Sequence, residues 1–280
     1  MEEHEEAFNP KRYWEERLQA YPGITGVGYL GRSPQLLEQQ YRSRMRQVEL
    51  ALGHYGLADL AGRSVLDIGA GTGIWMNFWH QHGAGCVAGL DFTQSSVDRL
   101  NEQFPDDLIV HADVSVSPLP LADTIRFDII SAFDVLLHIV DPNSFQRTIA
   151  NLAYYCAQGG WLVISDPIVQ GHGYVPRRSY GIHNKVRSIA EYQEVLSTYG
   201  FVIDSIWPTT VLLNNPLEAP NRLVFLALST WWRATRFWGY SNLFTSLLGP
   251  VAIKADQLAC RLCTDGRSPT AKMIFARKVN

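Results

Sequence analysis

Few cysteines, little net charge and no basic run are the first features of this sequence. Only four of its 280 residues are cysteines, a number that does not indicate a disulfide framework. The formal net charge is -3 at pH 7, so the chain lacks the basic patch or stripe that nucleic-acid binders usually carry. These absences exclude a small disulfide-stapled scaffold and argue against nucleic acid as a substrate.

Long apolar runs are missing as well. The most apolar stretch near the C-terminus, residues 223–232, is far shorter than the roughly 20 residues that cross a bilayer. The first six residues are acidic and contain no apolar region, so we expect no secretory signal. We therefore expect a cytoplasmic protein without a membrane span.

What the sequence does contain, from Arg63 onward, is a series of short apolar runs that alternate with amphipathic stretches. Strands that are apolar throughout, with helices between them, are typical of a parallel sheet covered on both faces. Two later runs predict two more strands, the last of which alternates in part, as an antiparallel strand near an edge does. The predicted strands are 64–68, 86–90, 107–111, 127–132, 161–165, 201–207 and 272–278, with helices at 74–81, 95–103 and 142–157.

Two further segments flank and interrupt this α/β pattern. Residues 1–62 predict a helical cap, with helices at 11–20 and 34–55, so the α/β domain spans 63–280. Residues 208–271 interrupt that domain and are too long for a loop and too apolar for a linker, which indicates a helical insertion. Its three tryptophans suit an apolar pocket wall, a homodimer interface or added core: Trp231, Trp232 and Trp238. A shallow membrane contact of residues 223–238 is a further alternative.

A glycine loop stands at the end of the first predicted strand. Asp67 ends the strand, and Gly69, Gly71 and Gly73 follow before a helix begins. Glycines let a ligand approach the main chain, and the helix N-terminus presents free N–H groups. The G-x-G-x-G spacing differs from the dinucleotide pattern G-x-G-x-x-G. An acidic side chain beside the loop suits a ligand that carries an ammonium group, whereas phosphate is best met by bare N–H groups.

Two more aspartates follow the next strands. Asp91 ends the second strand, 18 residues after Gly73, where a carboxylate can accept both hydroxyls of a ribose. Asp113 follows the third strand and is placed to accept from an adenine amino group. These residues, together with Asp67, Phe92, Val114 and the run 127–130, resemble the successive motifs of class I S-adenosylmethionine-dependent methyltransferases. The resemblance covers about residues 63–166.

This resemblance implies a Rossmann-like, seven-stranded, mostly parallel sheet with helices on both faces and an antiparallel last strand. It also implies that Asp67 and the glycine loop hold the methionine part of S-adenosylmethionine. Asp91 would bind the ribose, Phe92 would lie against the adenine, and Asp113 would bind its amino group. The predicted cofactor contacts are Asp67, Gly69, Ala70, Gly71, Gly73, Asp91, Phe92, Asp113, Val114, Phe133 and, from the N-terminal cap, Tyr13.

The chemistry is expected just after the fourth strand. Ligands of open parallel sheets lie beyond the carboxyl ends of the strands, so residues 131–142 should face the transferable methyl group. Methyl transfer is an in-line displacement, for which the enzyme mainly holds the nucleophile in place. A hydroxyl acceptor must also lose a proton, and a histidine poised near neutral pH is a natural base. We therefore predict His138 as the catalytic base; the alternative is a histidine that only caps a turn.

Acceptor contacts are predicted in the positively charged loop after the fifth strand and on the first helix. Arginines in such a loop suit a carboxylate or phosphate. The loop also contains His172, Arg177, Arg178 and Tyr180, and one arginine of the cap, Arg44, could reach the methionine carboxylate. The segment from His183 to Arg187 also resembles the post-strand-five segment of small-molecule members of the family. The predicted acceptor contacts are Tyr174, His183, Arg187 and Trp14.

The predicted function is transfer of a methyl group to a hydroxyl or carboxylate oxygen of a small molecule, such as a natural product or sugar derivative. The acceptor is expected to be anionic or partly apolar. The alternatives are a nitrogen or carbon methyltransferase and a scaffold that binds S-adenosylmethionine without catalysis. Cys260 and Cys263 lack the other ligands of a zinc set, so no metal is expected.

Overall fold

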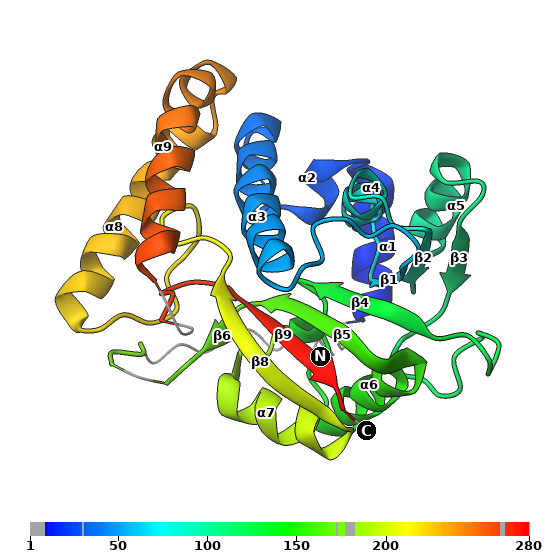
Figure 1. Cartoon of the computed structure of the whole chain (residues 1–280). Helices are drawn as coiled ribbons and strands as arrows, with labels where there is room; N and C mark the ends of the chain where they lie inside the picture. Colours follow the sequence, from blue (N-terminus) through cyan, green and yellow to red (C-terminus); the bar gives the residue numbers. More distant parts are fainter. Residues whose placement is uncertain (1–8, 30, 172, 177–182, 264–266, 280) are drawn as a thin grey trace, which may run out of the picture.

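The computed structural model describes residues 9–29, 31–171, 173–176, 183–263 and 267–279. Seven strands form one sheet in the order β3-β2-β1-β4-β5-β9-β8 (Figure 1). The first five pair in parallel, whereas β9 runs antiparallel to both β5 and β8. The predicted seven-stranded, mostly parallel sheet with an antiparallel last strand is therefore confirmed. Its strands are β1 (Ser64–Ile68), β2 (Cys86–Asp91), β3 (Leu108–His111), β4 (Phe127–Phe133), β5 (Cys156–Asp166), β8 (Phe201–Pro208) and β9 (Lys272–Lys278).

Most predicted element ends agree with the structure to within one or two residues, and β5 is the exception. It begins at Cys156, five residues before the predicted start at 161, and α6 ends at Tyr155 instead of residue 157. The early part of β5 pairs Cys156 with Phe127 of β4 across a register shift. Gly159 has φ +73°, so the chain bends here between the two paired parts. The predicted helix end was wrong because this strand start is polar and glycine-rich.

Local signals start several helices at the predicted places. Asn9, Ser33 and Asp141 each accept a hydrogen bond from a main-chain N–H of the first turn, and a proline follows each of them at the first helical position. Ser188 and Glu191 form a capping box at α7. The helices are α1 (Pro10–Ala20), α2 (Ile24–Val27), α3 (Pro34–His54), α4 (Ile74–Gln81), α5 (Gln94–Gln103), α6 (Pro142–Tyr155) and α7 (Ile189–Thr198).

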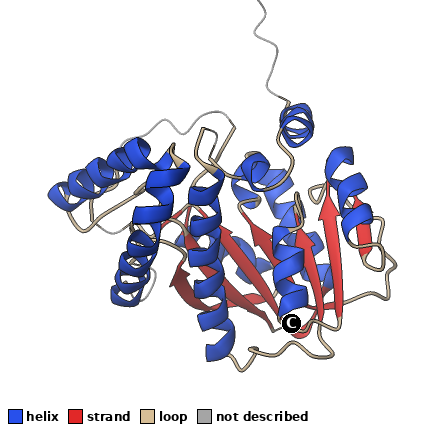
Figure 2. Cartoon of the chain, turned by 90° about the horizontal axis from the view of Figure 1, so that it is seen from above, coloured by secondary structure: helices blue, strands red, loops and turns tan. Residues whose placement is uncertain are grey.

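Helices cover the sheet on both faces (Figures 1 and 2). On one face α3 and α4 bury an aromatic cluster against the sheet, including Trp75, Phe78 and Trp79. On the other face α6 and α7 bury a mostly aliphatic cluster that contains Phe145 and Tyr192. Because both faces of the central strands are covered, β1 and β4 are apolar nearly throughout, and polar groups gather at the strand ends.

A helical hairpin occupies the predicted insertion between β8 and β9. It consists of α8 (Arg222–Gly239) and α9 (Asn242–Leu262), which stand beyond α3 at one end of the sheet (Figure 1). Among the described helices, none combines the length and the apolar character that a bilayer crossing requires.

One buried carboxylate joins α9 to the body. Asp256 accepts hydrogen bonds from the main-chain N–H groups of Val211, Leu212 and Leu213 at 2.8, 2.6 and 3.2 Å. It also accepts one from the Ser43 hydroxyl of α3 at 2.8 Å. The side chain is fully buried, so these four donors replace the water that the carboxylate loses.

We expect Asp256→Ala to lower the free energy of unfolding by about 3 kcal/mol, because three buried N–H groups lose a charged acceptor. Ser43→Ala is the matched control: it removes only one of the four donors and should cost about 1 kcal/mol. Urea titration of both variants measures the difference. Equal costs for the two substitutions would show that the carboxylate does not fasten the hairpin.

Candidate functional site

The glycine loop between β1 and α4 depends on its glycines. Gly69, Gly71 and Gly73 have φ values of +65°, +56° and +77°, a region that other residues rarely adopt. There is also no room for side chains at two of them. A Cβ at Gly69 would lie 2.5 Å from Val135, and one at Gly73 would lie 2.6 Å from Phe104. The loop therefore brings main chain close to the carboxyl edge of the sheet.

The N–H groups of this loop are bonded within the protein. Those of Gly69 and Ala70 donate to the carbonyl of Leu90 at 2.7 and 3.1 Å, and that of Gly73 donates to the Ala70 carbonyl at 2.8 Å. The N–H of Gly71 donates to the carboxylate of Asp91 at 2.9 Å. A phosphate would need such donors free. Four N–H groups of the loop, those of Gly69, Ala70, Gly71 and Gly73, are therefore not available to a phosphate.

Asp67 is a buried carboxylate at the end of β1. Its Oδ1 accepts a hydrogen bond from the Ser131 hydroxyl at 2.6 Å, and Ser131 in turn accepts one from the indole of Trp79 at 3.1 Å. Burial, with a smaller contribution from the nearby charge of Asp91, raises the pKa of Asp67 to about 7. Such a carboxylate favours the arrival of a positively charged group.

Asp91 at the end of β2 is also buried and is more fully hydrogen bonded. Besides the Gly71 N–H, it accepts from the main-chain N–H and the hydroxyl of Thr93 at 2.9 and 2.7 Å. Burial raises its pKa, and these three donors oppose that rise. A carboxylate has about four lone-pair sites, so Asp91 keeps capacity for about one further donor. Of the two predicted hydrogen bonds from the ribose hydroxyls, Asp91 has room for about one.

Other predicted cofactor contacts differ in how accessible they are. Phe92 is half-buried, and Asp113 is exposed with its Oδ1 bonded to the main-chain N–H and hydroxyl of Ser115 at 2.8 and 2.7 Å. The side chain of Val114 is buried in the core on the α6 side, so only its main chain remains for a cofactor. Phe133 packs 4.2 Å from Trp75, ring centre to ring centre, and is 6% exposed. Both side chains are thus as buried as most of the core, and their contact with the cofactor stays a prediction.

The N-terminal cap is fastened across this edge of the sheet. The Glu15 carboxylate of α1 accepts from the main-chain N–H groups of Gln94 and Ser95 at 2.8 and 3.0 Å, at the start of α5. The side chain of Val27 lies 3.3 Å from the position a Cβ on Gly71 would take. Residues of the cap thus cover the glycine loop and the start of α5.

Trp14 and Tyr13 lie on α1, and the structure brings one of them to the predicted base. The Trp14 and His138 rings meet edge to face, 5.0 Å between centres. Tyr13 packs against Trp14 at 5.4 Å and its hydroxyl accepts a hydrogen bond from Arg17 at 3.0 Å. Trp14 therefore closes one side of the space around His138, whereas Tyr13 is partly exposed behind it.

His138 ends the short 3-10 helix η1 (Leu136–His138), directly after β4. The main chain of His183 and the side chain of Asn184 hydrogen bond to its ring. Burial lowers the pKa of His138, while the nearby carboxylate of Asp134 opposes this effect. At neutral pH the imidazole is therefore largely unprotonated and able to accept a proton.

Arg187 holds the turn that carries His138. Its guanidinium donates to the carbonyl of Leu136 at 2.8 Å and to that of Ile139, and its centre lies 3.7 Å from the Phe145 ring centre. The residue is 2% exposed. Arg187 is thus buried and bonded to main-chain carbonyls at η1, and its contact with an acceptor stays a prediction.

Several polar residues at the ends of β4 and β5 escaped the sequence-based prediction. Asp134 has φ +59°, an uncommon conformation for a residue other than glycine, and its Oδ2 forms an ion pair with Arg44 at 2.6 Å. Arg44 also donates to the Ser165 hydroxyl at 3.3 Å. Arg44 was predicted to reach the methionine carboxylate of the cofactor; in the structure its guanidinium is paired with Asp134. The sequence carries no signal for this strained conformation of Asp134.

Asp166 lies next to this ion pair. Its Oδ2 accepts from the Tyr192 hydroxyl at 2.7 Å, and burial raises its pKa to about 8. Among the residues that the structure describes, its Oδ1 has no hydrogen-bond partner. The ends of β4 and β5 thus carry a compact polar group beside His138, formed by Arg44, Asp134, Ser165, Asp166 and Tyr192.

The predicted acceptor loop after β5 divides into three parts. Tyr174 bridges to Ala219 and packs against Phe225 of α8, 5.2 Å between ring centres, so it meets the hairpin. The segment from His183 follows η1, where the Lys185 N–H donates to the Leu137 carbonyl at 2.8 Å. The remaining predicted residues lie outside the described part of the chain: His172, Arg177, Arg178 and Tyr180.

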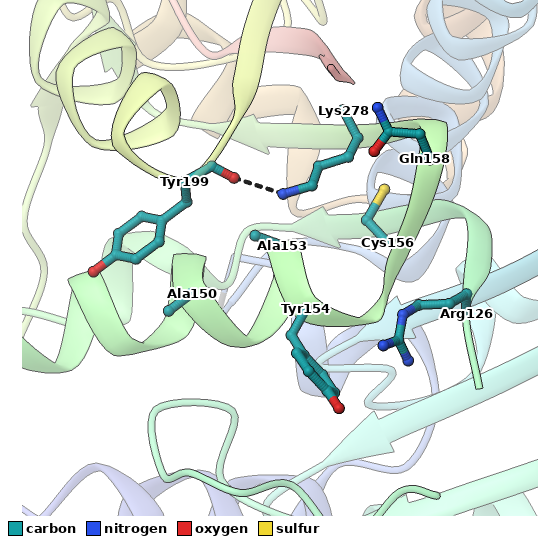
Figure 3. A pocket seen from close by; sticks show the side chains of 8 residues that line it. All are labelled: Arg126, Ala150, Ala153, Tyr154, Cys156, Gln158, Tyr199 and Lys278. Atoms are coloured by element: carbon teal, nitrogen blue, oxygen red, sulfur yellow. Dashed lines mark hydrogen bonds between the residues drawn. The ribbon is translucent and has the colours of Figure 1, made fainter. Parts of the chain in front are cut away.

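A surface hollow at the opposite end of the strands is separate from this site. Figure 3 shows it between the end of α6, the start of β5 and the end of β9, where Lys278 donates to the Tyr199 carbonyl at 2.7 Å. Burial raises the pKa of its Cys156 thiol to about 12, so the thiolate is scarce at neutral pH. The described residues contain no group of three or more metal-ligating side chains.

Comparisons with known proteins identify the family of the chain. A family model described as a methyltransferase domain matches residues 37–206, more than half of the chain. A ubiquinone biosynthesis O-methyltransferase of Paracidovorax citrulli is 34% identical over 135 residues, which are 46% of this chain and 54% of the relative. A tRNA U34 carboxymethyltransferase of Colwellia psychrerythraea is 34% identical over 140 residues, 48% of this chain and 40% of the relative. The chain thus spans about half the length of the curated relatives it matches.

A solved structure resembles the whole chain. It is a putative sarcosine dimethylglycine methyltransferase from Galdieria sulphuraria, with a TM-score of 0.58, 15% sequence identity, and coverage of 96% of this chain and 97% of that one. At this identity the likeness shows the fold alone. Together, the family match, the strand order and the glycine loop place the chain in the methyltransferase domain family, among the class I enzymes that use S-adenosylmethionine.

Proposed function

We propose that this protein transfers a methyl group from S-adenosylmethionine to a hydroxyl oxygen of a small molecule, with His138 as the base. The observation that carries the proposal is the position of His138. It directly follows β4 at the carboxyl edge, in contact with Trp14, and its pKa is lowered by burial. The name of the O-methyltransferase relative supports an oxygen acceptor.

The residues at the ends of β1 and β2 fit the proposed cofactor. Bound S-adenosylmethionine supplies a methyl group on a positively charged sulfur. The buried carboxylate of Asp67 suits the ammonium group of S-adenosylmethionine. The glycines of the loop have no side chains, so the main chain there can approach the ligand closely. Asp91 keeps capacity for a ribose hydroxyl. Because the loop N–H groups are already bonded, a ligand without phosphate fits better than a dinucleotide does.

His138 would act on the acceptor side of this pocket. As the acceptor oxygen forms its bond to the methyl carbon, the bond from that carbon to sulfur breaks, and the electron pair stays on sulfur. The proton of the hydroxyl passes to an unprotonated ring nitrogen of His138. The main chain of His183 and the side chain of Asn184 fix the ring during this transfer.

A hydroxyl acceptor suits the site better than a carboxylate does. A carboxylate is already a nucleophile and would need cations to orient it. Arg187, the predicted cation, is buried against η1, and Arg44 is paired with Asp134. Close to Trp14 lie the ring of His138, at 5.0 Å, and the guanidinium of Arg17, at 4.9 Å. Of these two groups, the histidine is the one that a hydroxyl needs as a base and a carboxylate does not.

The first prediction from the proposed function concerns Asp67 and pH. Since an ammonium group favours the ionised carboxylate, affinity for S-adenosylmethionine should be full above pH 7 and should fall by up to about tenfold per unit as Asp67 protonates below its pKa of about 7. Calorimetry between about pH 5.5 and 7.5 measures this slope. Asp67→Asn should bind more weakly and without that slope. A wild-type affinity that stays constant over this range would remove Asp67 from the binding site.

The second prediction concerns the base. His138→Ala should lower kcat by about 10²- to 10⁴-fold while cofactor affinity stays within about twofold. In the wild type, kcat should rise as pH increases toward the lowered pKa of His138 and level off above it. Labelled-methyl assays with a set of hydroxyl and carboxylate acceptors test both. Turnover near the wild-type rate in the variant would refute the base. Methyl transfer to no acceptor by the wild type, despite tight cofactor binding, would indicate a non-catalytic scaffold.

The third prediction concerns the position of η1. Arg187→Met removes both bonds to the turn and should lower kcat by about 10- to 100-fold with little change in cofactor affinity, because His138 shifts from its place. The lower limb of the pH profile should move toward the ordinary histidine pKa as the ring becomes more exposed. Lys185→Met is the control, since only its main chain bonds to η1. Equal effects of the two variants would contradict the specific role of Arg187.

A further inference from the structure

The long helix α9 has its large apolar side chains on the outside. Its buried positions are mostly small or polar: Thr245, Gly249, Ala252, Asp256 and Cys260. A helix that only covers a protein core shows the opposite pattern, with its apolar stripe turned inward. Gly249 marks how closely this inner face approaches α3, since a Cβ there would overlap the side chain of Gln39. The inner face is therefore already satisfied by α3.

The outer face of α9 is continuously apolar. At about 100° per residue, its exposed large side chains fall within an arc of about 140°. Their exposed fractions run from 47% for Leu248 to 78% for Leu262. The set is Leu243, Phe244, Leu247, Leu248, Val251, Leu258 and Leu262.

Helix α8 repeats the arrangement. Leu223 is 79% exposed, and Leu226 and Trp231 are exposed as well, whereas Ser229 and Thr235 are buried. We call the exposed apolar residues of α8 and α9 together the hairpin surface. Because the hairpin stands beyond α3 at one end of the molecule, no other described element covers it (Figures 1 and 2). Patches of this kind mark an interaction surface.

The charges of the hairpin are of one sign. Between residues 222 and 262 the sequence has five basic residues and one acidic residue, in a chain with a net charge of -3. That acidic residue, Asp256, is buried and bonded within the protein. Two of the basic residues, Lys254 and Arg261, lie on the same arc of α9 as the exposed leucines. An apolar stripe with exposed cations beside it is typical of helices that lie in a membrane interface.

This charge pattern favours one of two binding partners for the hairpin surface, a second copy of the chain or a lipid bilayer. A second copy of the chain, docked by a two-fold axis through the same surface, would bring like charges together across the contact. A bilayer that contains anionic lipids meets both features at once, since it buries the leucines and attracts the cations. We propose that the hairpin surface binds the face of a membrane rich in anionic phospholipids, with α8 and α9 lying in the interface and neither helix crossing it.

Packed aromatic residues connect the hairpin surface with the segments around His138. Trp232 of α8 contacts Tyr29 of the cap at 5.4 Å between ring centres, and Phe225 contacts Tyr174 of the loop after β5. The hairpin is thus joined to the cap and to the loop after β5. This inference goes beyond the proposed methyl transfer and does not depend on the identity of the acceptor.

Cosedimentation of the full chain with vesicles tests the proposal. Wild-type protein should bind vesicles of mixed phosphatidylcholine and phosphatidylglycerol at least about tenfold more strongly than vesicles of phosphatidylcholine alone, and added salt should weaken this binding. Leu247→Glu with Val251→Glu should abolish it. Lys254→Glu with Arg261→Glu should lower it at least about tenfold.

The control is Val202→Glu on the edge strand β8, at an apolar residue that is 53% exposed and lies away from the hairpin. It should bind vesicles like the wild type. Cofactor binding and thermal unfolding of each variant show that the fold is intact. The proposal is overturned by no binding to phosphatidylglycerol vesicles, by equal binding to both vesicle types, or by the same loss in the control. It is also overturned if the wild type is a dimer that the Leu247 and Val251 substitutions make monomeric without any vesicle binding.

Discussion

Two carboxylates buried side by side, at the ends of β1 and β2, are the constraint on which the site depends. Among the described residues no lysine or arginine forms an ion pair with Asp67 or Asp91. Their burial is made tolerable by hydrogen bonds: Ser131 to the first, Gly71 and Thr93 to the second. Even so, burial raises the pKa of Asp67 to about 7, because the ionised carboxylate loses its hydration inside the protein. A cationic ligand beside Asp67 would offset that loss.

The rest of the catalytic edge is arranged around that pocket by long-range contacts. Glu15 fastens the cap to the start of α5, and Trp14 then reaches the ring of His138. On the other side, Arg187 holds η1 by two carbonyls. Trp14 of the cap and Arg187 lie 173 residues apart in the sequence. The position of His138 thus depends on contacts from two segments that are distant in the sequence.

The parts that sequence predicts well are those set by local rules. Buried parallel strands are continuous apolar runs, and the three glycines of the loop have positive φ, so both leave a direct mark on the sequence. The start of β5 leaves none, since its first residues are polar and glycine-rich and pair only through β4. Likewise, nothing near Arg187 in the sequence shows that its charge meets the carbonyls of Leu136 and Ile139. The positive φ of Asp134 also appears only in the folded chain.

The hairpin shows the same limit in another form. Residues 242–262 have the periodicity of an amphipathic helix, and from the sequence alone the apolar stripe would be placed inward. The direction is instead set by Asp256, whose four donors lie on α3 and on the segment from Val211 to Leu213. If Asp256 faced water, the three main-chain N–H groups and the Ser43 hydroxyl that bond to it would lose this acceptor inside the protein. The carboxylate therefore turns inward, and the leucines that follow the same helical repeat must turn outward to whatever medium can take them.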